Sequence, residues 1–382
     1  MISPVMPASD PLVYTVTASP VGDLESLGCE WRALESLSSR HSFFLSWHWI
    51  GSWLKCLPAS ERPLVLRIKE QDKAIGLAIL CRGKSSLLRF LRMEQVALNA
   101  TGDSGFDAIA IEYNGFLSMD GMQEVVLRQA LCWLLRGELP NQIIWLSGVD
   151  EEVLKFAADQ AHPHQRQVQL INISACPFVD LQKVRNSGNG YESFLSRNTR
   201  QALRRTQRHF EKIGPLEYHT GSSLSEAMEI FAELEQAHQR YWLERGNPGA
   251  FANDFFKQFH TELINSAFEE GHIELARISA GNTIIGYLYN FIWKGTIYAY
   301  QSGFNYTEDK MARPGYMSHY LAILHALEGG KSIYDFMAGE AQHKLSLATD
   351  RQTLFWVQFR KQTPLLKLDM LIRNILRISR KH

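Results

Sequence analysis

The pattern of hydrophobic and polar positions predicts a similar order of helices and strands in the two halves of the chain. In the first half, apolar residues recur at helical spacing over 24–37 and 122–135, and β-like runs cover 64–69, 74–81, 106–112 and 142–146. In the second half, helices are predicted at 191–213, 225–244, 251–270 and 315–327. Strands are predicted there at 272–279, 283–293, 296–303, 332–337 and 354–360. This order of elements indicates an α+β fold.

The breaks between these elements indicate how the chain is divided. Glycine-containing turns at 280–282 and 294–295 separate three strands of the second half, which is typical of an antiparallel meander. Breaker residues are frequent from 162 to 190, so a linker or a crossover strand shared between domains is expected there. We therefore predict two domains, 1–175 and 176–362, each with a mixed, largely antiparallel sheet flanked by helices.

Length and composition agree with a two-domain globular protein. The chain has 382 residues, of which 45% are hydrophobic and 21% are charged. Lys plus Arg equals Asp plus Glu at 40 each, so bulk charge gives no indication of a DNA partner. The five cysteines form no C-x-x-C pair and the histidines show no H-E-x-x-H spacing, so no disulfide framework and no metal site are predicted. No secretory signal pattern and no apolar run of about 20 residues is present, which favours a cytoplasmic location.

A first candidate site lies where Arg313-Pro314-Gly315 precedes a predicted helix. Glycine allows close approach of the backbone to a ligand, and the first turn of a helix offers unpaired N–H groups that bind phosphate. Arg313 would add a charge-assisted hydrogen bond. An ordinary turn followed by a helix start explains the same residues.

A second candidate site lies between residues 334 and 344. Asp335 stands between Tyr334 and Phe336 in a strand that should be buried, and a buried carboxylate needs a partner or a chemical role. Glu340, His343 and Lys344 follow on the loop after this strand. The alternative is a structural ion pair between Asp335 and a basic residue.

Arginines and aromatic residues provide weaker candidates for substrate contacts. Arg197, Arg200, Arg204 and Arg208 share one stripe of a predicted helix, which favours an anionic partner, although a solvated helix face is the plain alternative. Trp49 and Trp242 could stack on a sugar ring, but such residues more often pack in a core.

Several short motifs, in this order, resemble those of CelD-like acetyltransferases of the GNAT superfamily, which are related to Fem-type aminoacyltransferases. The resemblance begins with Glu30-Trp31, Ser42-Phe43-Phe44 and Trp49, and continues with Ser196-Arg197-Asn198-Thr199-Arg200. The segments 238–245, 298–304 and 313–315 are also similar, as are Tyr334-Asp335-Phe336, Gly339-Glu340 and Lys344. Leu45 and His343 depart from the usual glutamine and tyrosine.

The resemblance implies two GNAT-like folds, with catalysis in the second and an acyl-CoA as co-substrate. The acyl thioester would lie near Tyr287 to Tyr289, and the pyrophosphate would contact Gly315, Tyr316 and Met317 together with Arg313. Asp335 would orient or deprotonate the acceptor, Lys344 would stabilise negative charge, and Tyr300 would donate a hydroxyl hydrogen bond. Acceptor contacts would come from Trp49, Arg197, Arg200, Trp242, Glu340 and His343.

The expected activity is therefore acyl transfer, from acetyl-CoA or another acyl-CoA, to an amine or hydroxyl of a sugar or cell-envelope precursor such as that of an exopolysaccharide. No metal cofactor is expected. Two alternatives remain: an aminoacyltransferase that uses aminoacyl-tRNA, and a non-catalytic component of a polysaccharide assembly. Residues 363–382 form a basic amphipathic pattern, which predicts a helix that lies on the inner face of a membrane or docks on the protein itself. The acceptor could accordingly be free or lipid-linked.

Overall fold

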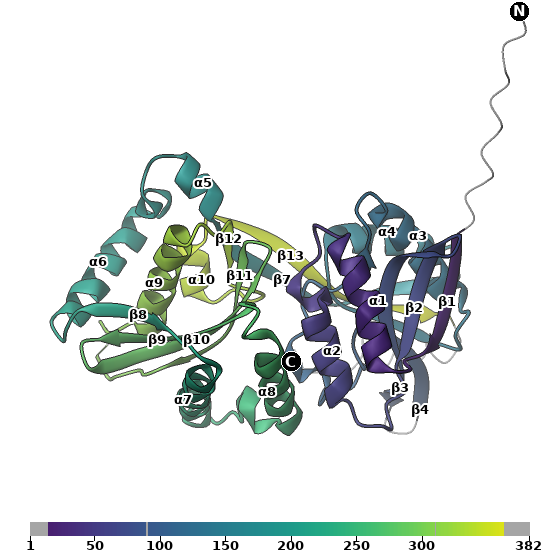
Figure 1. Ribbon diagram of the computed structural model, residues 1–382, viewed down its shortest axis with the longest axis horizontal. Helices are drawn as coiled ribbons and strands as arrows, with labels where there is room; N and C mark the ends of the chain where they lie inside the picture. Colours follow the sequence, from purple (N-terminus) through teal and green to yellow (C-terminus); the bar gives the residue numbers. More distant parts are fainter. Residues whose placement is uncertain (1–13, 89–90, 310, 363–382) are drawn as a thin grey trace, which may run out of the picture.

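The computed structural model describes residues 14–88, 91–309 and 311–362, in which one sheet runs through both halves of the chain (Figure 1). The first half contains β1 (Tyr14–Pro20), α1 (Leu24–Ser36), η1 (Phe43–Leu45), α2 (Trp47–Cys56), β2 (Leu64–Glu70), β3 (Lys73–Leu88), β4 (Leu91–Leu98), η2 (Asp107–Ile109), β5 (Leu117–Ser118), α3 (Gln123–Arg136), β6 (Ile143–Val149), α4 (Glu151–Ala161) and β7 (Arg166–Asp180). The second half contains α5 (Leu181–Asn186), η3 (Tyr191–Phe194), α6 (Arg197–Glu211), β8 (Leu216–Thr220), α7 (Leu224–Leu243), η4 (Ala250–Ala252), α8 (Asp254–Ala267), β9 (Ile273–Ala280), β10 (Thr283–Trp293), β11 (Thr296–Phe304), α9 (Pro314–Glu328), β12 (Ile333–Asp335), α10 (Gln342–Leu347) and β13 (Asp350–Lys361).

The two halves repeat one arrangement of elements and are related by an approximate two-fold symmetry. The strand order is β1-β2-β3-β4-β6-β13-β7-β12-β11-β10-β9-β8, with β5 beside β3. Reading this order from either end gives equivalent strands, so β4 and β6 of the first half correspond to β11 and β12 of the second. Both of these pairs are parallel, whereas most neighbouring strands are antiparallel. The predicted α+β class, with mixed sheets flanked by helices, is confirmed.

The halves exchange their last strands at the centre of the sheet. β7, the last strand of the first half, pairs with β12, and β13, the last strand of the second half, pairs with β6. The two exchanged strands pair with each other from Asp350↔Phe178 to Lys361↔Arg166. The breaker-rich segment therefore contains a shared strand, and residue 175 lies inside it. Neither half completes its sheet alone.

Helices cover both faces of the sheet, and the packing of one face continues across both halves. On β10, Tyr287, Tyr289 and Phe291 belong to a hydrophobic core that also contains α1, α2, α7 and α8, while Ile285 and Leu288 face the opposite core with α6 and α9. From Tyr287 to Phe291 this division follows from the alternation of side chains along a strand, and the register shift between Ile284 and Gly286 places Ile285 on the opposite face. The corresponding helices α2 and α8 meet at the seam, where the Ser52 and Ser266 hydroxyls are 3.1 Å apart.

Three predicted elements differ from the structure. The strand predicted at 106–112 is wrong: the Asp107 carboxylate accepts hydrogen bonds from the Thr101 and Gly102 N–H groups at 2.8 and 2.7 Å, and the chain folds into η2. The helix predicted at 191–213 is two elements, because Ser196 has an extended backbone and starts α6 as its N-cap. Asn253 starts α8 in the same way, two residues after the predicted start of that helix.

Within the described residues, none of the helices is long and apolar enough to cross a membrane. The helix predicted at 363–382 lies outside the described residues.

Candidate active site between the two halves

Strands β11 and β12 separate at Asp335, and this separation forms the centre of the candidate site. Their parallel pairing covers Thr296↔Ile333, Ile297↔Tyr334 and Tyr298↔Asp335 only. β11 continues to Phe304, but the chain turns away after Asp335. The Asp335 carboxylate accepts a hydrogen bond from the Met337 N–H at 2.7 Å, and Met337 has a positive φ of 62°. The last paired residues therefore face an opening at the carboxyl ends of both strands.

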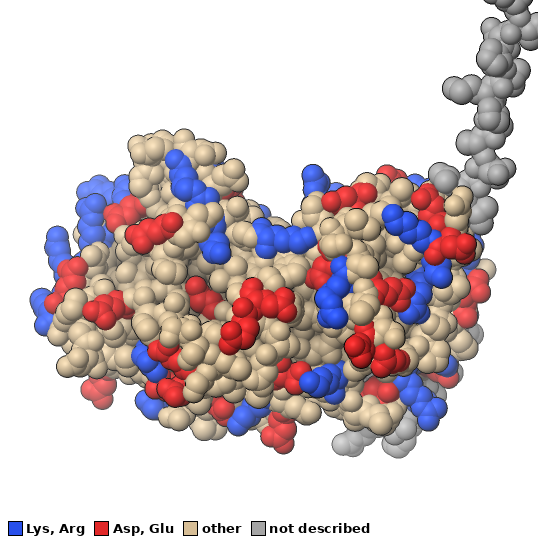
Figure 2. Space-filling view, in the orientation of Figure 1, with Lys and Arg blue, Asp and Glu red and all other residues tan. Residues whose placement is uncertain are grey.

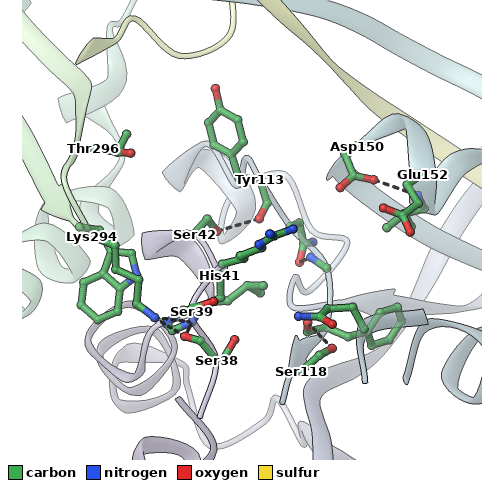
Figure 3. A pocket seen from close by; sticks show the side chains of 18 of the residues that line it. Ser38, Ser39, His41, Ser42, Tyr113, Ser118, Asp150, Glu152, Lys294 and Thr296 are labelled. Carbon is green, nitrogen blue, oxygen red and sulfur yellow. Dashed lines mark hydrogen bonds between the residues drawn. The ribbon is translucent and has the colours of Figure 1, made fainter. Parts of the chain in front are cut away.

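A pocket of about 770 Å³ lies between the two halves and runs along the parallel pair, from Trp293 and Lys294 on the turn before β11 to Tyr298 and Asp335 (Figure 3). From the first half, the wall includes residues 38–42 and 113–116 and several residues between 150 and 153. From the second half, it includes several residues between 293 and 298, together with Asp335 and Gln352. Many lining side chains carry hydroxyl or amide groups, including those of Ser38, Ser39, Ser42, Asn114, Ser118 and Thr296. The wall contains two basic side chains, Lys294 and Arg40, and four acidic ones, Glu124, Asp150, Glu152 and Asp335. Such a lining suits a polar, hydroxylated molecule.

Asp335 is the buried acid of this pocket, with 1% of its surface exposed. Besides the Met337 N–H, its carboxylate accepts from the Tyr113 hydroxyl at 2.7 Å and from the Gln352 side-chain amide at 3.2 Å. Burial raises the pKa of Asp335 to about 6, while these hydrogen bonds and the nearby Lys344 ammonium oppose the rise. A carboxyl with a pKa near neutrality can accept a proton from a substrate and release it again. Gln352 is exposed, so a ligand can displace its amide from Asp335.

Glu112 and Lys344 hold the loop that follows Asp335. The Ala338 N–H donates to the Glu112 carboxylate at 2.8 Å, and the Lys344 ammonium donates to the carbonyls of Phe336 and Ala338 at 2.7 and 2.9 Å. Burial raises the pKa of Glu112 to about 7 and lowers the pKa of Lys344. Glu112 and Tyr113 come from the first half, so both halves build the surroundings of Asp335.

A second buried polar cluster lies in the shared core. The Tyr300 hydroxyl donates to the Ile109 carbonyl at 2.6 Å and lies 2.9 Å from His260 Nε2. Since a carbonyl only accepts, the hydroxyl proton is used there and His260 Nε2 donates to Tyr300. His260 Nδ1 lies 3.3 Å from the Tyr289 hydroxyl. To donate to a substrate, the Tyr300 hydroxyl would have to give up its hydrogen bond to Ile109. To bind a cofactor, the Tyr289 hydroxyl would have to leave His260.

The start of α9 provides a set of donors suited to phosphate. Its first intrahelical hydrogen bond runs from the Met317 N–H to the Arg313 carbonyl, so the N–H groups of Gly315 and Tyr316 precede the helical ladder. No side chain of the described residues caps this end, and the Arg313 side chain is exposed beside it. Gly315 also has a packing reason for lacking a side chain, because a Cβ there would lie 2.8 Å from the Phe304 ring. Met317 is fully buried, so only its backbone could contact a ligand.

Comparison with protein families finds a similarity in the second half of the chain. Residues 197–345 match the family model described as the acetyltransferase (GNAT) domain. This segment of the second half is similar to GNAT acetyltransferase domains. The match ends before β13 and begins after β7, so the strands that complete this domain at the centre of the sheet lie outside it. No curated protein sequence matches the chain.

Solved structures share the fold over nearly the whole chain. FemX has a TM-score of 0.58 at 11% identity, and the similarity covers 93% of this chain and 99% of that one. L-PGS from Bacillus licheniformis has a TM-score of 0.50 at 12% identity, over 92% of this chain and 96% of that one. At these identities the likeness shows the fold, and function has to be inferred from the site.

Two of the predicted acceptor contacts, Trp49 and Trp242, lie apart from the pocket. Trp49 is 1% exposed and packs on Phe44 and Phe259, with ring centroids 4.7 and 4.8 Å away, so its surroundings are those of a core residue. Trp242 lies at the end of α7, where its indole N–H donates to His238 Nε2 at 2.9 Å. Neither residue is among those that line the pocket in the described part of the chain.

The remaining predicted contacts are also absent from the described residues that line the pocket. Glu340 is exposed on the loop after β12, and the His343 ring stacks on His319 with centroids 5.4 Å apart. Burial lowers the pKa of His343 to about 4, so its ring is neutral at physiological pH. On α6, the Arg197 side chain is exposed. The Arg200 guanidinium donates to the Leu195 carbonyl at 2.5 Å and so stabilises the segment that precedes the helix. Figure 2 shows Lys and Arg side chains gathered over α6 at the left end of the molecule.

The sequence reading did not identify Glu112, Tyr113 or Gln352. Glu112 follows the apolar residues Ile109 to Ile111, and Asp335 interrupts an apolar run. An acid next to apolar residues was therefore the one available signal for Glu112. Tyr113 and Gln352 carry no local pattern, because they reach Asp335 from the other half and from the exchanged strand β13.

Proposed function

We propose that the protein transfers an acyl group, acetyl in the simplest case, from an acyl-CoA to an amine or hydroxyl of a sugar or cell-envelope precursor. The observation that carries this proposal is the position of Asp335. It combines a pKa near 6, a place in the pocket wall and a place at the end of the parallel strand pair within the segment similar to GNAT domains.

The chemistry requires little beyond positioning and one proton acceptor. The acceptor amine or hydroxyl attacks the thioester carbonyl, its proton passes to the Asp335 carboxylate directly or through water, and the CoA thiolate leaves. Tyr113 and Gln352 orient the carboxylate through their hydrogen bonds. The polar lining of the pocket supports a hydroxylated acceptor.

The start of α9 fits the pyrophosphate of CoA. Two backbone N–H groups precede the helical ladder, the helix dipole favours negative charge there, and Arg313 is exposed at the same end. We expect Arg313→Glu to weaken the binding of acetyl-CoA about tenfold or more, which calorimetry measures. Arg62→Glu, an equal change at an exposed position of the first half, is the matched control. Gly315→Val is unsuitable as a test, because its side chain would meet Phe304.

The direct test of the activity is release of CoA from acetyl-CoA in the presence of amino sugars, nucleotide sugars and simple amines. A panel member that supports release by the wild type, but not by Asp335→Asn, would identify the acceptor class. If acetyl-CoA neither binds nor turns over with any panel member, the proposed donor is wrong.

A second candidate is aminoacyl transfer from aminoacyl-tRNA, as in the Fem-type enzymes that the sequence motifs resemble. The exposed side chains of Arg197, Arg204, Arg205 and Arg208 on α6 favour it, because such a stripe can contact RNA phosphates. Charge reversal at Arg204 and Arg208 should abolish tRNA binding under this candidate and leave acetyl-CoA binding intact. Filter binding with aminoacyl-tRNA at several salt concentrations distinguishes the two donors.

A further inference from the structure

Three metal-binding side chains meet at the seam between the halves, outside the candidate active site. His48 lies in the first turn of α2, and Glu270 and His272 lie on the turn between α8 and β9. One ligand atom from each of these residues lies within 4.8 Å of the other two. The grouping has no local sequence pattern, because its members come from opposite halves of the chain. This explains why histidine spacing predicted no metal site.

The tautomer of His272 suits metal binding. Its Nδ1 lies 3.2 Å from the Ile292 carbonyl, which only accepts, so Nδ1 carries the hydrogen. The lone pair of the neutral ring is then on Nε2. The Ile292 N–H donates to the His272 carbonyl at 2.8 Å. Two hydrogen bonds therefore hold His272 against Ile292 of β10. A ring N–H held by a backbone carbonyl is the usual support of a metal-binding histidine.

The distances between the other ligand atoms suit a tetrahedral ion. His48 Nε2 lies 3.3 Å from Glu270 Oε2. Two ligands at bond lengths of roughly 2.0–2.1 Å from a tetrahedral zinc ion are roughly 3.3 Å apart, so this pair already has the required separation. The His48 and His272 ring centroids are 5.0 Å apart. The Glu270 side chain is 63% exposed, so it can adjust its position at little cost.

We propose that His48, Glu270 and His272 bind a divalent transition-metal ion of the zinc type, with water as a fourth ligand. Two imidazoles and one carboxylate form a common ligand set for this ion. The ion joins α2 of the first half to the α8–β9 turn of the second. At the same seam Lys55 pairs with Glu262 at 2.7 Å and Ser52 contacts Ser266, so the ion extends an existing contact between the halves.

The bound ion stabilises the wall of the pocket. The Trp293 ring packs on His272, with centroids 4.7 Å apart, and also lines the pocket beside Lys294. Fixing His272 therefore fixes Trp293. The role is structural, since none of the three ligands is among the described residues that line the pocket.

Titration of the full-length, chelator-treated protein with ZnCl₂ tests the site. We expect one ion per chain by calorimetry and an increase in Tm of roughly 3 °C or more at saturating zinc. Visible absorption of bound Co²⁺ reports the coordination geometry. His48→Gln and Glu270→Ala should each weaken binding about tenfold or more and remove the increase in Tm, because each deletes one ligand.

The matched control is His219→Gln, which removes the histidine of another His–Glu pair, 2.6 Å from Glu226. This variant should bind zinc as the wild type does. The exposed Glu270 keeps the test informative if His48→Gln fails to fold. Absence of stoichiometric binding to the wild type, or binding that persists unchanged in both ligand variants, overturns the proposal.

Discussion

The two halves of the molecule place different residues at equivalent positions of one fold. In the second half, the last parallel pair of β11 and β12 is Tyr298↔Asp335, and in the first half the last pair of β4 and β6 is Ala97↔Trp145. The carboxylate therefore has an apolar counterpart. The segments that lie beside the ends of these strand pairs also differ between the halves. This difference determines whether the gap between the strands is filled.

The opening of the first half is closed by asparagines. Asn114 forms a parallel bridge to Val149 and donates its backbone N–H to the Gly148 carbonyl at 2.9 Å, so it occupies the gap beside β6. The Asn99 side-chain amide donates to Asn114 and to the Gly115 carbonyl, at 2.8 Å each. Amide groups that satisfy each other in a buried site provide rigidity and carry no titratable group.

The opening of the second half is surrounded by ionisable groups. Asp335 and Glu112 are buried and Lys344 is partly buried, and desolvation shifts the pKa of each toward its neutral form. Such groups cost stability, and they cluster where a chemical step needs them. The comparison teaches that the duplicated fold divides the work: the first half supplies a closed frame and the residues Glu112 and Tyr113, and the second supplies the reactive opening.

The largest effect is expected from Asp335→Asn. Asparagine keeps an oxygen for the Met337 N–H but cannot accept a proton from the acceptor, so kcat should fall about a hundredfold or more with the fold intact. Asp107→Asn is the control, because it changes a partly buried carboxylate of the first half whose partners are Thr101 and Gly102. It should lower the Tm and leave kcat unchanged. Equal loss of kcat in both variants would remove the distinction between the halves.

The sequence indicated candidate residues of the second half, and it indicated none of the residues around them that come from the first half. Asp335 and Lys344 could be identified because one interrupts an apolar strand and the other follows on a loop. Glu112 and Tyr113 could not, since a pattern within 106–112 does not show that Asp107 would bind Thr101 and turn the chain. A tertiary contact overrode the local β pattern there.

The exchanged strands show the same limit for the fold. Breaker residues between 162 and 190 indicated a break or a shared strand, but only the structure shows that β7 pairs with β12 and that β13 pairs with β6. Pairing partners far apart in the chain leave no periodic signal in either strand. For Gly315, the sequence suggested close approach of a ligand as the reason for a glycine. The structure shows a second reason, because a side chain there would collide with the Phe304 ring.

The second largest effect is expected from Lys344→Met. The substitution keeps the length of the side chain but leaves the carbonyls of Phe336 and Ala338 without the ammonium, which should lower the free energy of unfolding by about 3 kcal/mol. Because these residues follow Asp335 directly, kcat should fall as well, by about tenfold. Urea unfolding and steady-state kinetics separate the two effects. A stability loss with normal kcat would show that Lys344 only supports the loop.

The pH dependence should identify which carboxyl acts as the base. The pKa of Asp335 is raised to about 6 and that of Glu112 to about 7, and a base works only when ionised. We expect kcat/KM to be full above pH 7 and to fall as the pH decreases through about 6, with this midpoint retained in Glu112→Gln. A midpoint near 7 that disappears in Glu112→Gln would assign the base to the first half.

The smallest effect on activity is expected from Asn99→Ala, although the fold should lose stability. The Asn99 side chain accepts from the Ile79 N–H at 2.7 Å and donates to two partners, all of them buried. Its removal leaves unsatisfied groups and should lower the free energy of unfolding by about 3 kcal/mol, whereas kcat at a temperature where the protein stays folded should not change. Asn189→Ala, at an exposed asparagine after α5, controls for the substitution itself and should change neither quantity. Because Asn99 closes the first opening and Asp335 lines the second, a drop in kcat comparable to that of Asp335→Asn would mean that the closed half also takes part in the reaction.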